Sequence, residues 1–101
     1  MQNQTVMDVA FQLAKKAHDS ASHAAAKDQL QSKFPSEPWD EIVNAYVKGC
    51  ELVEKCYEIA DSARRLKISD AEAIEMLRQR FPGFSGNIYN EALTHGWFLS
   101  R

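Results

Sequence analysis

Residues 37–66 read EPWDEIVNAYVKGCELVEKCYEIADSARRL, the longest helical pattern in this chain of 101 residues. Apolar residues repeat every seven positions along it, at Trp39, Tyr46, Val53 and Ala60. Other apolar side chains fall between them at spacings of three and four, and the stripe keeps its phase across Gly49. The pattern therefore predicts one continuous helix from about Glu37 to Leu66 with Ser36 as its N-cap, a break at Gly49 being the alternative.

Two further helical segments precede this stretch. Apolar spacings of three and four predict a helix over about residues 5–20 and another over about residues 22–33. Phe34-Pro35 ends the second, because proline lacks an N–H donor and restricts the residue before it. The alanine-rich residues 21–26 leave open whether these are two helices or one bent helix.

The second half of the chain carries clear helix boundaries. Ser69-Asp70-Ala71-Glu72 has the Ser-x-x-Glu pattern of a capping box and predicts a fourth helix, which ends at Phe81-Pro82-Gly83. Ser85 can cap a fifth helix, and Gly96 followed by Trp97 is typical of a glycine C-cap. No segment alternates with period two, so we predict an all-α fold, a compact bundle of about five helices.

The chain resembles itself at an offset of 47 residues. The matches join Ser22 to Ser69, Leu30 to Leu77, Phe34-Pro35 to Phe81-Pro82, Ala45 to Ala92 and Gly49 to Gly96. They predict a pseudo-twofold duplication of a helical hairpin, with repeat units of about residues 22–52 and 69–99. Two copies are too few for a solenoid, so we expect a closed bundle with one shared core.

The length and net charge of the chain limit the number of domains and the classes of partner that we expect. A chain of this size has room for one core, so we expect residues 1–101 to form a single helical domain. Twelve basic and fourteen acidic residues leave a net charge of −2, which disfavours nucleic acid or anionic lipid as a partner. No apolar run reaches the ~18 residues of a membrane span, and no signal-peptide core follows Met1.

Cys50 and Cys56 fall within one predicted helix, about 9 Å apart along its axis. A disulfide needs Cα atoms within about 7 Å, so we expect two free thiols in a reducing compartment. The expected location is therefore cytoplasmic.

No constellation of residues points to catalysis or to metal binding. His18 and His23 are five residues apart, which places them on different helical faces, whereas a helical metal pair needs a spacing of three or four. His18-Asp19-Ser20 contains the residue types of a hydrolase triad, but neighbours on a helix point in different directions. The glycines form no phosphate-binding loop. We therefore expect no catalytic residue, metal or cofactor, and no enzyme.

Aromatic residues flank the predicted hairpin loops and provide the remaining functional signal. They either plug the ends of the bundle or form an interface. The candidate interface residues are Trp39, Tyr46, Trp97, Phe98 and Leu99. We expect a non-enzymatic protein–protein interaction or regulatory module, acting through the helix at 37–66 as a homodimer or with another protein.

Two alternatives come from other functional classes. One is a small-ligand binder with an apolar cavity between the halves, lined by Met76, Phe81, Tyr46 and Cys50. The other is a helix-turn-helix formed by the last two helices. The candidate reading helix of that motif, residues 85–96, contains no Lys or Arg to contact nucleic acid, which disfavours it.

Overall fold

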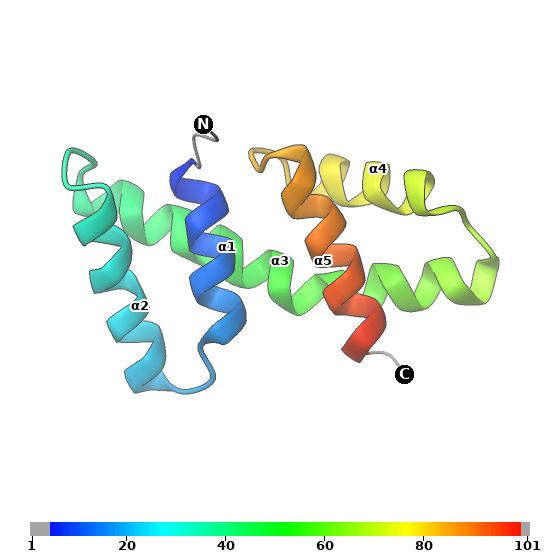
Figure 1. Ribbon diagram of the computed structural model, residues 1–101, viewed down its shortest axis with the longest axis horizontal. Helices are drawn as coiled ribbons and strands as arrows, with labels where there is room; N and C mark the ends of the chain where they lie inside the picture. Colours follow the sequence, from blue (N-terminus) through cyan, green and yellow to red (C-terminus); the bar gives the residue numbers. More distant parts are fainter. Residues whose placement is uncertain (1–4, 100–101) are drawn as a thin grey trace. The chain divides into compact units, whose positions relative to one another are not determined.

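The computed structural model of the chain describes residues 5–99, with the backbone alone at residues 98 and 99. Over this range the chain forms five helices (Figure 1): α1 (Val6–Lys16), α2 (Ser20–Lys33), α3 (Trp39–Leu66), α4 (Asp70–Arg80) and α5 (Gly86–Leu99). Residues 5–99 contain no strand, which confirms the predicted all-α fold. Within the same range, none of the helices combines the length and the apolar character that crossing a membrane requires.

The first two helices are separate, and each begins at a capping side chain. Thr5 Oγ1 accepts a hydrogen bond from the Asp8 N–H at 3.2 Å and caps α1. The Asp19 carboxylate accepts one from the Ser22 N–H at 2.7 Å and caps α2. Ala17 is extended, at φ −78° and ψ 141°, and α1 stops at Lys16. The Asp19 cap starts α2 at Ser20, so both predicted boundaries are corrected.

The two Phe-Pro sequences stop their helices with nearly the same backbone geometry. Phe34 ends α2 at φ −128° and ψ 65°, and Phe81 ends α4 at φ −131° and ψ 70°. Ser69 Oγ accepts from the Glu72 N–H at 3.2 Å, so the predicted cap of α4 is confirmed.

The helix α3 starts two residues after the predicted position of about residue 37. The Glu37 N–H donates to the Phe34 carbonyl at 3.0 Å, so residue 37 still belongs to the turn that follows α2. The Pro38 carbonyl then accepts from Ile42 at 3.1 Å, and the helix begins at Trp39. Ser36 therefore lies outside the helix and is not its cap.

The long helix passes through Gly49 without a break, as predicted. It ends where Lys67 adopts the left-handed conformation, with φ 56°. The Ile68 N–H then donates to the Ala63 carbonyl at 2.9 Å, which is the six-to-one bond of a Schellman motif. This turn reverses the chain toward α4.

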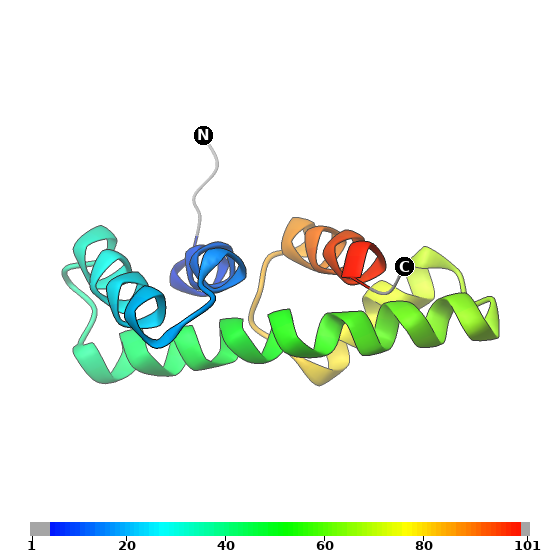
Figure 2. The ribbon, with the colours of Figure 1, turned by 90° about the horizontal axis from the view of Figure 1, so that it is seen from below.

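The chain divides into two compact units, and the division falls inside α3, after Glu51. Unit 1 contains α1, α2 and the first part of α3. Figures 1 and 2 both show α1 and α2 side by side, and Figure 2 places them on one side of this part of α3. The core of unit 1 is centred on Phe11, Leu30, Ile42 and Tyr46, each at most 2% exposed.

Unit 2 contains the second part of α3 together with α4 and α5, and α5 crosses α3 (Figure 1). Its largest buried side chains are Leu52, Leu77, Ile88, Tyr89 and Leu93. At the crossing, a Cβ on Gly96 would lie 2.5 Å from the Cys56 carbonyl oxygen. Gly96 therefore sits inside α5 at a close helix contact, and the predicted glycine C-cap at this position is wrong.

Unit 1 has an equivalent contact. A Cβ on Gly49 would lie 2.9 Å from the backbone of Ala10 and Phe11 in α1. In each unit, then, a glycine of the third helix meets the backbone of the first, and a Phe-Pro sequence ends the second. These correspondences agree with the repeat at offset 47. The duplication and the single domain both stay predictions.

Candidate functional site

The clearest unexplained surface lies on the part of α3 that belongs to unit 1. It consists of Trp39, Val43, Val47 and Cys50, which we call the α3 face. Trp39 is 47% exposed and Val47 46% exposed, and the other two side chains are half-buried. These positions follow one another at spacings of four, four and three, so they form a stripe about 17 Å long.

The core of unit 1 lies on the opposite side of this helix. Ala45 and Gly49, each two residues from Val47, are buried, and two positions correspond to a rotation of about 200°. Val47 therefore points directly away from the core. No packing inside unit 1 accounts for a valine at this position.

The α3 face has an acidic border. Asp40 and Glu51 are exposed and lie within about 40° of Val47 around the helix. Lys48 is the single basic residue between positions 39 and 51. Within the described part of the chain, neither Asp40 nor Glu51 makes an ion pair. Glu51 thus flanks the stripe on one side, and Asp40 lies near its N-terminal end, so two carboxylates lie next to an otherwise apolar surface.

The acids of α3 in unit 2 are arranged differently. Asp61 accepts from Arg64 at 3.2 Å and from Arg65 at 3.1 Å, and Glu58 lies 3.7 Å from Lys55. The charges of Asp61 and Glu58 are therefore compensated along their own helix, whereas the exposed Glu54 makes no ion pair within the described residues. The excess of uncompensated carboxylates belongs to the first part of α3.

Two of the predicted interface residues have distinct environments in unit 1. Trp39 is exposed and is the first residue of the α3 face. Tyr46 is only 2% exposed, and its hydroxyl lies 2.6 Å from His23 Nδ1, which joins α3 to α2. Burial raises the pKa of Tyr46 to about 12, with a smaller contribution from neighbouring Cys50. Tyr46 is a core residue, and we leave it out of the proposed surface.

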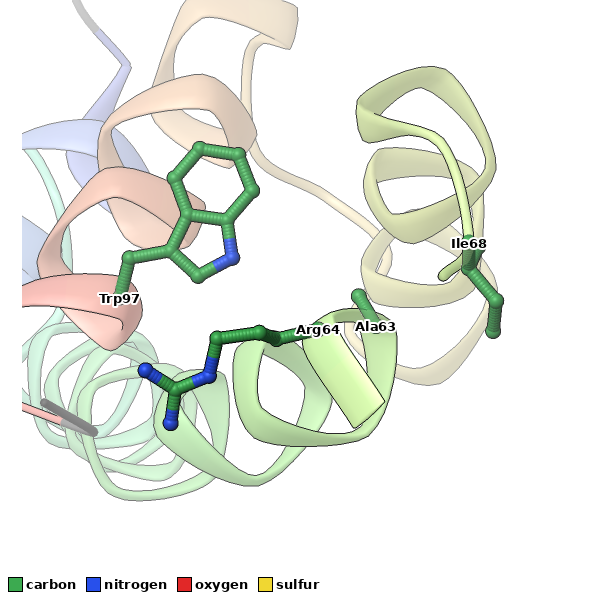
Figure 3. Close-up of a pocket in the computed structure, with 4 residues that line it drawn as sticks. All are labelled: Ala63, Arg64, Ile68 and Trp97. Carbon is green, nitrogen blue, oxygen red and sulfur yellow. The ribbon is translucent and has the colours of Figure 1, made fainter. Parts of the chain in front are cut away.

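The other predicted interface residues are close to the end of the chain. Trp97 is half-buried and lines a pocket of about 300 Å³ in unit 2 with Ala63, Arg64 and Ile68 (Figure 3). The indole extends from α5 toward this pocket, and the Arg64 guanidinium lies on the α3 side of it. The side chains of Phe98 and Leu99 lie outside the described part of the chain.

A second pocket of about 310 Å³ lies in unit 1, between α1 and α2 around Leu13, Ala17 and Ala26. Neither pocket is lined by the residues predicted for a ligand cavity. Tyr46 and Cys50 of that set belong to unit 1, whereas Met76 and Phe81 belong to unit 2. The set is therefore divided between two units.

Few groups in the structure have the environment of a reactive site. Over the described residues, no group of three or more His, Cys, Asp or Glu side chains could hold a metal ion. His18 Nε2 lies 3.9 Å from Asp19 Oδ2, with both side chains mostly in solvent. Burial raises the pKa of the Cys56 thiol to about 11, which keeps it protonated at neutral pH and lowers its reactivity.

Comparison of the chain with protein-family models, with curated proteins and with solved structures found no match. The chain's own surface and chemistry are therefore the basis for assigning a function. On that basis the α3 face is the strongest candidate.

Of the four residues of this site, the sequence analysis predicted only Trp39 as an interface residue, and Val47 is the most exposed of the three that it missed. The seven-residue repeat drew attention to Tyr46, one position away, as part of the stripe. A usable signal was present, because Val47 lies four residues after Val43 and directly opposite the small residues Ala45 and Gly49. Only their burial shows which side of the helix meets the core.

Proposed function

We propose that this chain is a non-enzymatic interaction module that binds another protein through the α3 face. One observation supports it above all: Trp39 and Val47 stand nearly half exposed, two turns apart, on a helix whose other side forms the core of unit 1. Covering apolar surface is worth roughly 25 cal/mol per Å². Tryptophan is also among the residues that contribute most to protein interfaces.

The proposal includes a reducing, cytoplasmic setting and no reaction step. Cys50 and Cys56 are both free thiols, which supports that setting. Cys50 is half-buried within the α3 face, and a reducing compartment would protect its thiol from oxidation.

A small-ligand binder is the second candidate, and the pocket beside Trp97 supports it. The charged group at that pocket, Arg64, already donates to Asp61 at 3.2 Å. A nucleic-acid binder has weaker support, because the sequence of α5 contains no Lys or Arg. We therefore favour the protein interaction.

Site-specific photo-crosslinking tests the proposed function. A benzophenone amino acid replaces Val47 in the full chain, and in a control chain it replaces Leu66, which is 70% exposed near the end of the same helix. We expect a protein adduct of discrete mass from position 47, lost when Val43→Lys is added, and none from position 66.

The outcomes separate the candidates. Equal adducts from both positions, or none from position 47, contradict binding through the α3 face. Native mass spectrometry of the purified chain addresses the second candidate, because a bound small molecule would appear there as a constant mass increment. Such an increment, together with no adduct at position 47, would favour the ligand binder.

A further inference from the structure

We infer that the partner presents a basic amphipathic helix to the α3 face, and that the partner is not a second copy of this chain. This inference rests on the proposed function and adds the chemistry of the partner to it. It depends on three features of unit 1: the line of apolar side chains, the acidic border beside it, and the register that a second copy would have to adopt.

The shape of the α3 face suits a helix. Trp39, Val43, Val47 and Cys50 follow one another along a single helix for about 17 Å. Such a ridge packs against another helix whose apolar side chains recur at spacings of three and four. Two of the four side chains are nearly half exposed, so a partner can cover substantial apolar area on them without rearranging the core.

The charge beside the stripe selects a positively charged partner. Glu51 lies one turn from Val47, Asp40 lies beside Trp39 and Val43, and neither carboxylate forms an ion pair within the described residues. Lysines or arginines flanking the apolar positions of a partner helix would lie opposite these carboxylates. Exposed pairs of this kind add little affinity each, but complementary charge speeds association and excludes acidic partners.

In a homodimer formed through the α3 face, carboxylates of that face would lie in unfavourable positions. Two copies related by a twofold axis present the same patch to each other, with their α3 helices either parallel or antiparallel. In a parallel pair, Glu51 of one copy lies beside Glu51 of the other, so like charges meet. In an antiparallel pair, the register decides what Glu51 faces. In a register centred on Val47, Glu51 of one copy faces Val43 of the other. Shifting the centre to Ala45 makes Glu51 face Trp39 instead. Either register covers an apolar side chain with a carboxylate that loses its water.

Two designed peptides of equal length provide the probe. Both carry leucines at spacings of three and four on an alanine background, with flanking lysines in one peptide and flanking glutamates in the other. Isothermal titration into the full chain measures their dissociation constants. We expect the lysine peptide to bind at least about tenfold more tightly, and Val47→Lys to abolish its binding.

A matched pair of charge reversals locates the effect. Glu51→Lys removes a border carboxylate, whereas Asp28→Lys makes the same change in net charge at an exposed position of α2 in the same unit. We expect Glu51→Lys to weaken binding of the lysine peptide about threefold or more and Asp28→Lys to leave it unchanged. Equal binding of the two peptides, no binding of either, or equal effects of both reversals would overturn the inference.

Sedimentation of the chain over a range of concentrations separates this inference from the proposed function. A dimer that Val47→Lys dissociates would overturn the basic-helix partner and leave protein binding through the α3 face intact. A monomer at every concentration supports the inference. Failure of crosslinking at position 47 would instead contradict the proposed function itself.

Discussion

Single side chains hold the two Phe-Pro loops in place. The Tyr89 hydroxyl donates to the Phe81 carbonyl at 2.5 Å and accepts from the Phe84 N–H at 3.3 Å, so one group closes the loop between α4 and α5. In unit 1 the Gln31 amide donates to the carbonyls of Phe34 and Glu37, at 3.1 Å and 2.9 Å. Each loop thus keeps its carbonyl groups hydrogen-bonded, by a different residue type in each unit.

The buried Cys56 predicts a loss of stability at alkaline pH. Burial raises the pKa of this thiol from 9.0 to about 11, so folding favours the protonated form. Its contribution is present in full below pH 9.0 and is lost as the pH rises toward 11. We expect the free energy of unfolding, measured with urea, to fall over this interval by at most about 1.4 kcal/mol per pH unit from this group.

Cys56→Ala is the control for this pH dependence, because alanine fits a buried helical position and does not titrate. The variant should be less stable at neutral pH but should lose less stability between pH 9 and 11. An identical slope in both proteins would show that Cys56 does not contribute. Tyr46, whose pKa burial raises from 10.0 to about 12, loses its own contribution between these two values, and the two proteins share this loss.

At the scale of helices, two glycines allow backbones to meet. Gly49 lies against α1, and Gly96 lies against the second part of α3. In both places a Cβ would fall within 3.0 Å of backbone atoms, which cannot move aside as a flexible side chain can. Small residues at these crossings therefore set how closely the helices of each unit pack.

Gly96→Ala and Gly49→Ala should destabilise the protein, by about 1–3 kcal/mol each, because the new methyl group forces helices apart. Gly96→Ala should have the larger effect, since its Cβ would lie at 2.5 Å rather than 2.9 Å from the nearest backbone atom. Gly86→Ala is the matched control, with nothing within 4 Å of its Cβ. Urea unfolding checks the order, and a Gly96→Ala midpoint equal to that of Gly86→Ala would contradict the close contact.

At the scale of the whole chain, two compact units share one helix without a linker. A helix gains stability from its neighbouring turns, so melting one part of α3 removes support from the other. We therefore expect the units to unfold together, as a single domain of this size does.

The chain contains two tryptophans, Trp39 in unit 1 and Trp97 in unit 2, which make this testable. Trp97→Phe leaves fluorescence that reports on unit 1, and Trp39→Phe leaves fluorescence that reports on unit 2. Each single-tryptophan variant is followed in urea both by its fluorescence and by far-ultraviolet circular dichroism. Coincident transitions by the two probes within each variant are expected. A fluorescence midpoint separate from that of the helical signal would show that the units unfold independently.

The sequence by itself determined the helices and most of their ends. Phe34-Pro35, Phe81-Pro82 and the Ser69 cap act on backbone groups within a few residues, so their effect can be read without knowing the fold. The continuity of α3 through Gly49 was readable for a similar reason, since one apolar stripe keeps its phase on both sides.

The tertiary structure decided which side of each helix is used. Gly96 has the local sequence of a C-cap but lies within α5, because α3 crosses there and leaves no room for a side chain. Tyr46 and Val47 are adjacent, yet one is buried against His23 and the other faces solvent. Such choices depend on which distant segment packs against a residue, and spacing along the chain carries no information about that partner.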